Sequence, residues 1–227
     1  MPDQFSKITI QEIISSLKEP LPGQRAHMKM LPGGRSLTLP TNYSQVKKSA
    51  VLILLFYEQG LLHFCLTKRN SNLKNHPGQI SFPGGRCEKY ETDPWETALR
   101  ETDEEIGIPP HQIQFLGKLS DVFVSVSNFN IHPYIGFIQE KPTFIINHKE
   151  VEKLIVLPLH SLFTEENHAI EMLETRNGKM NVPCYLIEDH VIWGATSMMI
   201  AELEVLLKQH YSGQEEHLNN ADSDQES

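Results

Sequence analysis

The sequence predicts an α/β protein in which a mixed β-sheet lies between helices on both faces. Three observations carry this prediction: two apolar runs joined by a short turn, a capped acidic helix after them, and later strand-length runs that lead into a last amphipathic helix. At 227 residues and 25.9 kDa the chain can bury a full core. We therefore expect one large domain rather than two small ones.

Residues 1–47 are predicted to form a helix and an extension that pack on this domain. Thr9 and Glu12 have the spacing of a capping box, and apolar residues at helical intervals follow. Two prolines and a glycine come next and end the helix. We expect the helix to run from about Thr9 to Lys18.

The main domain is predicted over residues 48–210 and begins with a hairpin of buried strands. Its two apolar runs are 50–57 and 61–67, with a three-residue turn that ends in glycine between them. A last amphipathic helix is expected at about 195–209. The remaining strand candidates are 114–121, 131–138, 154–157, 183–187 and 190–193.

The formal charge of −9 is unevenly spread along the chain. Residues 212–227 carry five Asp or Glu and no Lys or Arg, which leaves −4 for the rest. This polar, acidic tail, taken as residues 211–227, is predicted to be disordered and to have no role in the fold. Nothing in the sequence resembles a basic groove for DNA or RNA, so we expect a small anionic ligand with its own counter-ion instead.

The three cysteines, Cys65, Cys87 and Cys184, are isolated in the sequence. Their spacing argues against a zinc site and against a disulfide framework, and indicates a reducing compartment. The N-terminus does not resemble a signal peptide, and no stretch approaches 18 apolar residues. We expect a cytoplasmic protein with no membrane partner.

A short helix after the hairpin is predicted with defined ends. Asp93 can act as N-cap, Pro94 suits the first helical position, and Glu96 completes a capping box. Gly107, followed by two prolines, ends the helix. Helical spacing predicts a core-facing stripe of Trp95, Leu99, Thr102 and Ile106.

Three carboxylates lie together off that stripe. Glu101 and Glu105 are spaced i, i+4, and Glu104 lies beside Glu101. Like charges at this spacing repel by roughly 0.2–0.5 kcal/mol, and a bound cation would reverse the sign. The cluster indicates a hard divalent cation. A bare acidic run of this kind is more often a solvated helix face, and a structural calcium-binding helix is a further alternative.

The residues before this helix are basic and rich in glycine. From Gln59 to Cys87 there is no Asp or Glu, whereas Glu88 to Glu105 contains eight. Gly84 and Gly85 permit close approach of the backbone to phosphate or metal. The side chains that could bind phosphate are Lys68, Arg69, Lys74 and His76.

The pattern Arg100-Glu101-x-x-Glu104-Glu105-x-Gly107, after a Phe-Pro-Gly-Gly turn, resembles the Nudix box. This box is the signature of hydrolases that cleave diphosphate bonds in nucleoside diphosphates linked to another group. The resemblance implies a Nudix-type α/β/α sandwich and a loop-helix-loop that binds Mg²⁺ or Mn²⁺. Glu101 and Glu105 match the principal ligands, and Glu104 matches an accessory or water-positioning acid. Arg100 would pair with a box glutamate and hold it in place.

One part of the box departs from the family pattern. Gly85 and Glu91 have the expected separation, but Arg100 comes one residue late. The shift predicts that Glu91 does not take the family's structural role. Either Glu91 or Asp93 would then serve as the helix cap.

The run from Leu66 to Arg69 and the run from Leu73 to Gly85 resemble the extended motif of the coenzyme A diphosphatase branch of Nudix hydrolases. The likeness extends over roughly residues 48–208. The branch usually has a small residue where Asn70 stands, and arginine where Lys74 stands. Lysine keeps the charge but loses the bidentate fork, so we expect altered substrate affinity or choice.

The resemblance implies metal-dependent hydrolysis of coenzyme A (CoA) or an acyl-CoA to 3′,5′-ADP and 4′-phosphopantetheine or its acyl form. Glu105 or Glu104 would act as general base, and the basic side chains would bind the phosphates. Two alternatives stay open. One is a Nudix diphosphatase for an oxidised nucleoside triphosphate, ADP-ribose or a nucleotide sugar, and the other is a nucleotide-sensing protein without catalysis. Dimers are common in the superfamily, so the chain could form a homodimer.

Overall fold

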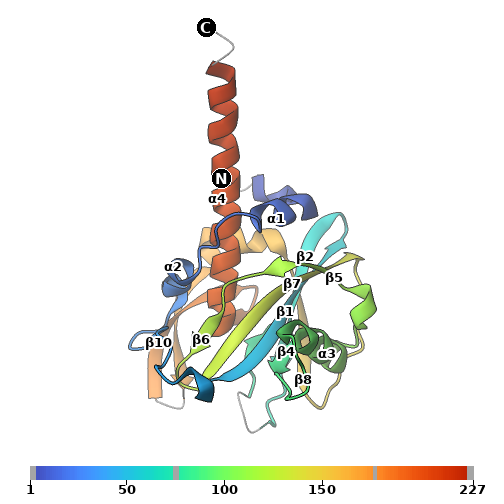
Figure 1. The fold of residues 1–227 in the computed structure, drawn as a ribbon, viewed down its shortest axis with the longest axis vertical. Helices are drawn as coiled ribbons and strands as arrows, with labels where there is room; N and C mark the ends of the chain where they lie inside the picture. Colours follow the sequence, from blue (N-terminus) through green and yellow to red (C-terminus); the bar gives the residue numbers. More distant parts are fainter. Residues whose placement is uncertain (1–3, 74–76, 176–177, 224–227) are drawn as a thin grey trace.

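The computed structural model describes residues 4–73, 77–175 and 178–223, and its layers are those that the sequence predicts (Figure 1). A large mixed sheet lies between α3 (Pro94–Ile106) on one face and α1 (Ile10–Ser16) with α4 (Ala195–Ser223) on the other. The predicted α/β class, with a mixed sheet between helices, is therefore confirmed.

Eight of the described strands form the large sheet, in the order β3-β2-β1-β7-β5, with β4 beside β1, β6 beside β7 and β8 beside β2. β1 and β7 run parallel, and the other pairs are antiparallel. A second sheet has the order β11-β10-β9. The strands are β1 (Lys47–Glu58), β2 (Leu61–Arg69), β3 (Ile80–Ser81), β4 (Gly84–Arg86), β5 (Gln114–Lys118), β6 (Val122–Val124), β7 (Phe129–Glu140), β8 (Val151–Pro158), β9 (His168–Thr175), β10 (Gly178–Ile187) and β11 (His190–Trp193).

The predicted hairpin of buried strands is β1 and β2. β1 is buried on both faces, since Leu54 belongs to the core under α3 and Leu55 to the core under α1 and α4. A strand covered on both faces needs apolar residues in succession, which explains the unbroken run. The turn residues Gln59 and Gly60 have φ of 53° and 80°, as a type I′ turn requires.

Helix α3 begins and ends where the sequence predicts. Asp93 Oδ1 accepts a hydrogen bond from Trp95 N at 2.9 Å, and Gly107 ends the helix with φ 71°. The predicted capping box is not formed, because Asp93 accepts from Trp95 N and not from Glu96 N. Glu96 accepts from Thr92 N at 3.3 Å rather than from Asp93, because the chain bends at these two residues.

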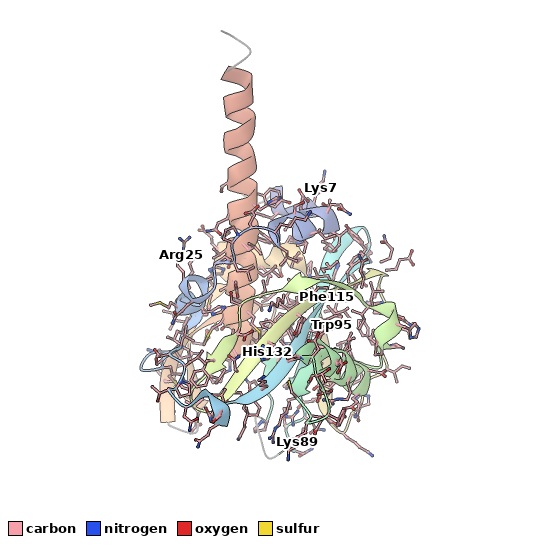
Figure 2. The ribbon with its side chains drawn as sticks, viewed as in Figure 1. Lys7, Arg25, Lys89, Trp95, Phe115 and His132 are labelled. Carbon is pink, nitrogen blue, oxygen red and sulfur yellow. The ribbon has the colours of Figure 1, made fainter. Side chains whose placement is uncertain are left out.

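The predicted core-facing stripe of α3 is confirmed. Thr102 and Ile106 are fully buried, and Trp95 and Leu99 pack against the same core. Trp95 also meets Phe115 of β5 with ring centroids 5.1 Å apart, and the two lie next to each other in Figure 2. This stripe fixes how α3 is rotated on the sheet, and so which of its side chains reach the rim.

Helix α4 continues past its predicted end at Gln209 to Ser223, so that prediction is wrong. It extends into the segment predicted to be disordered, and Figure 1 shows it rising away from the body. No proline interrupts this segment, and its one glycine costs a helix only about 1 kcal/mol. Among the described residues, no helix is long and apolar enough to cross a membrane.

The N-terminal extension contacts α4 and the sheet. α1 has both halves of the capping box predicted for Thr9 and Glu12. α2 (Gln24–His27) meets α4, where the buried Glu202 accepts from Gly23 N at 3.1 Å and lies 2.8 Å from His27 Nε2. The 3₁₀ turns are Gln4–Lys7, Met28–Met30, Tyr43–Gln45, Pro110–Gln112, Leu159–Phe163 and Glu165–Asn167.

Candidate functional site

The glycines of β4 allow this strand to lie against β1 and α3. A Cβ at Gly84 would stand 2.3 Å from the Ala50 carbonyl oxygen of β1. A Cβ at Gly85 would stand 2.4–2.5 Å from the carboxylate atoms of Glu101. Glycine at both positions is thus what lets the Glu101 carboxylate rest on the backbone of β4. Approach of the same backbone to a phosphate stays a prediction.

Glu105 is the most enclosed of the three acids on α3. It is 5% exposed, and the Thr67 hydroxyl of β2 donates to its Oε2 at 3.3 Å. Burial, followed by the charges of Glu101 and Glu150, raises the pKa of Glu105 to about 8. Arg69 and the Thr67 hydroxyl oppose this shift without cancelling it. The carboxylate therefore lies where negative charge is poorly compensated.

Arg100 connects the other two acids. Its Nη1 donates to Glu101 Oε1 at 2.7 Å and to Glu104 Oε2 at 3.1 Å. Burial raises the pKa of Glu101; Arg100 opposes that rise, and the charges of Glu104 and Glu150 add to it. The predicted pairing of Arg100 with a box glutamate is therefore present.

Glu91 also belongs to this network, so the prediction that the one-residue shift removes it is wrong. Arg100 Nε donates to Glu91 Oε1 at 2.8 Å, and Thr97 Oγ1 donates to Glu91 Oε2 at 2.7 Å. The bend at Thr92 and Asp93 takes up the extra residue and returns Glu91 to the side of the helix. Counting along the chain cannot reveal such a bend.

A fourth acid, Glu150, adjoins the site and is not indicated by the sequence patterns. It stands directly before β8, and its charge raises the pKa of both Glu101 and Glu105. β8 pairs with β2, the strand that carries Thr67. The one signal for Glu150 in the sequence is that it is an acid just before a predicted strand. The sequence does not show that this strand pairs with β2, because that pairing is long-range.

The predicted phosphate-binding side chains lie in different places. Arg69 stands two residues after Thr67 on β2, so strand alternation places it on the same face as Thr67, and its charge opposes the rise in the pKa of Glu105. Strand alternation places Lys68 on the opposite face, where its Nζ donates to Glu152 Oε1 at 2.6 Å. The structure thus brings Arg69, and not Lys68, toward the acids of α3. Two further predicted residues lie outside the described residues, namely Lys74 and His76.

The acids of α3 have the oxygen donors that a hard cation needs, but they are not arranged around a common point. Within the described ranges, no three His, Cys, Asp or Glu side chains meet closely enough to hold a metal ion. Glu101 and Glu104 instead contact the guanidinium of Arg100, at 2.7 and 3.1 Å. The oxygen-only donors are nevertheless those that Mg²⁺ and Mn²⁺ prefer. A cation would offset the repulsion that adds to burial in raising the pKa of Glu101 and Glu105. To take part, Glu104 would have to turn away from Arg100.

Comparisons with known proteins find similar sequences over most of the chain. The model of the NUDIX domain family matches residues 46–176. The chain is 36% identical over 138 residues to the Nudix hydrolase NudL of Pectobacterium atrosepticum, which covers 61% of this chain and 71% of that protein. It is 32% identical over 210 residues to NudL of Yersinia enterocolitica, and this match covers 89% of this chain and 97% of that protein. A solved structure of the Nudix hydrolase RenU from M. smegmatis aligns with a TM-score of 0.49 and 16% identity over 73% of this chain and 86% of that one.

Proposed function

Because the chain belongs to the Nudix hydrolase family, we propose that it hydrolyses the diphosphate bond of CoA or an acyl-CoA. The products would be 3′,5′-ADP and 4′-phosphopantetheine or its acyl form. One observation carries the proposal: the segment that resembles the CoA diphosphatase motif adjoins the acids. Within it, Thr67 bonds to Glu105, and Gly85 leaves room for the Glu101 carboxylate.

The acids of α3 and their partners would divide the work at the diphosphate. A divalent cation, Mg²⁺ or Mn²⁺, would be held by Glu101, Glu105 and Glu104, and it would neutralise the diphosphate and lower the pKa of a bound water. Arg100 orients Glu101 through a charge-assisted bond of 2.7 Å. Arg69, on the same face as Glu105, would bind a phosphate oxygen.

Three carboxylates are candidates for the general base. Glu105 and Glu104 are proposed from the box, and Glu150 joins them because its charge reaches both Glu101 and Glu105. A positioned base contributes typically 10²- to 10⁴-fold in rate. Replacing Glu150 by glutamine would test whether it belongs with the other two, since only the base and the metal ligands should cost factors of this size.

The other basic side chains are proposed to bind the remaining phosphates. CoA carries a 3′-phosphate as well as its diphosphate, so it offers more than one anionic group to Lys68, Lys74 and His76. Lys68 would have to exchange its contact with Glu152 for a phosphate. That pair is partly exposed, and ion pairs in contact with solvent add little to stability. The exchange would therefore cost little.

A substrate panel tests the proposal. The purified protein would be incubated with CoA, ADP-ribose and nucleoside triphosphates, each with Mg²⁺ or Mn²⁺, and the products would be separated by chromatography. We expect 3′,5′-ADP from CoA as the leading product. Rapid turnover of another compound with CoA left intact would refute the CoA assignment. Absence of hydrolysis with every compound would instead favour a nucleotide-sensing protein.

A further inference from the structure

Asn70, where the chain departs from the CoA diphosphatase motif, joins two segments that are distant in sequence. It directly follows β2. Its Nδ2 donates to the His148 carbonyl at 2.9 Å, and its main-chain N–H donates to the Glu150 carbonyl at 2.7 Å. Its Oδ1 accepts from Asn72 N at 3.0 Å. Asn70 thus connects the end of β2 to the segment 147–150.

The same segment is fixed on its other side by the C-terminal end of α3. Asn147 N donates to the Glu105 carbonyl at 3.0 Å, and Ile145 N donates to the Ile106 carbonyl at 2.9 Å. The last carbonyls of a helix lack partners within the helix, so these bonds satisfy them. Residues 145–150 therefore bridge the end of α3 and the end of β2, and Glu150 is the last residue of that bridge.

A turn within the bridge sets the direction of Glu150. Glu150 N and Val151 N both donate to the Asn147 carbonyl, at 3.0 and 2.9 Å. His148 lies inside this turn, so the bond from the Asn70 side chain holds the turn at its middle. A residue whose side chain cannot reach the His148 carbonyl would leave the turn attached to β2 through the main chain of residue 70 and the pairing of β8 with β2.

We propose that Asn70 is a positioning residue, whose side-chain bond to the His148 carbonyl fixes Glu150 beside the acids of α3. The proposal rests on the proposed hydrolase function, because Glu150 must contribute to the reaction for its position to matter. It also gives Asn70 a role other than the altered substrate choice expected from the motif. A small residue at this position could not reach the His148 carbonyl.

Two matched substitutions separate this role from a general effect on the loop. Asn70→Ser shortens the side chain so that no donor reaches the His148 carbonyl, and keeps a side-chain oxygen for the turn at Asn72. Asn72→Ser makes the same chemical change two residues later, at an exposed side chain, and leaves the bond to His148 in place. Both variants should unfold within a few degrees of the wild type.

The first test is hydrogen exchange in the metal-free protein. We expect the Glu150 and Val151 amides to exchange roughly three- to tenfold faster in Asn70→Ser, the factor that corresponds to one net hydrogen bond, and to be unchanged in Asn72→Ser. Unchanged exchange in Asn70→Ser would overturn the proposal, because the bond would then not hold the turn.

The second test is a double-mutant cycle in the hydrolysis assay. Asn70→Ser should lower kcat roughly three- to tenfold with KM within about twofold, and should cause no further loss when Glu150 is already glutamine. The same loss in both backgrounds, a loss confined to KM, or full activity of Glu150→Gln would each overturn the proposal. If CoA is not hydrolysed, the cycle is run on the panel compound that is. The CoA assignment can then fail without deciding the role of Asn70. A chain that hydrolyses nothing would overturn both.

Discussion

Alanine at Gly85 is expected to remove most of the activity while leaving the fold intact. The added Cβ would stand 2.4 Å from Glu101 Cδ and 2.5 Å from both carboxylate oxygens, whereas ordinary contacts begin at 3.4 Å. The carboxylate must therefore move by about 1 Å. Because Glu101 is a flexible side chain at the rim, this movement costs the fold little, but it displaces a proposed metal ligand and its bond to Arg100.

The expected size of the effect follows from that displacement. A shift of about 1 Å in a positioned group can cost about 10²-fold in rate. We expect kcat/KM of Gly85→Ala to fall by about two orders of magnitude, with the free energy of unfolding lowered by at most about 1–2 kcal/mol. The assay is steady-state hydrolysis across a range of Mg²⁺ and Mn²⁺ concentrations, together with urea unfolding of the same preparations.

The neighbouring glycine supplies a matched control. A Cβ at Gly84 would meet the main chain of β1, 2.3 Å from Ala50 O and 2.7 Å from Val51 Cα, and Gly84 has φ 155°. Main chain cannot turn aside as a side chain can, so Gly84→Ala should lower the free energy of unfolding by about 3 kcal/mol or more. Alanine should thus reduce mainly the activity at Gly85 and mainly the stability at Gly84. Full activity of Gly85→Ala, or unfolding as severe as that of Gly84→Ala, would refute the assignment of Glu101.

Two further predictions concern stability. Glu91→Gln weakens the bond from Arg100, and should lower the free energy of unfolding in urea by about 1–2 kcal/mol; no change would mean that Arg100 finds an equivalent partner. Burial would raise the pKa of Glu204, but its hydrogen bonds outweigh burial and lower the pKa from 4.5 to about 2. The hydrogen bond from His168 contributes most to this lowering. A lowered pKa stabilises the fold above pH 4.5 and loses that effect toward pH 2. Glu204 alone should account for a loss of about 3 kcal/mol across this window, so Glu204→Gln should lose less than the wild type. Equal acid sensitivity of the two proteins in urea titrations would contradict this.

Features encoded by adjacent residues are those that the sequence predicts well. The ends of α3 follow from Asp93, Pro94 and Gly107, because an N-cap, a first-turn proline and a left-handed glycine act on the helix next to them. The hairpin follows from two apolar runs and a short turn. The acids on one rim of α3 follow from helical spacing, since the core-facing stripe fixes the rotation of the helix.

Features that depend on distant pairing or on a bend escape sequence reasoning. Glu91 reaches Arg100 through the bend at Thr92 and Asp93, and Glu150 reaches the site through the pairing of β8 with β2. The short strands β3 and β4 are two and three residues long, too few for a periodic pattern. β9 is not among the predicted strands, although its apolar residues Ile170 and Met172 alternate, and the structure leaves both exposed.

The most direct test of the proposed function compares the wild type with Glu105→Gln on CoA, by counting 3′,5′-ADP formed per enzyme in the presence of Mg²⁺ or Mn²⁺. Glutamine should fit the buried site, because the raised pKa shows that an ionised carboxylate is unfavourable there without a cation. We therefore predict that the wild type forms 3′,5′-ADP, and that Glu105→Gln does so at least about 10²-fold more slowly with an unchanged unfolding temperature. Equal rates for the two proteins, or a wild type that leaves CoA intact while hydrolysing another nucleotide, would contradict the account.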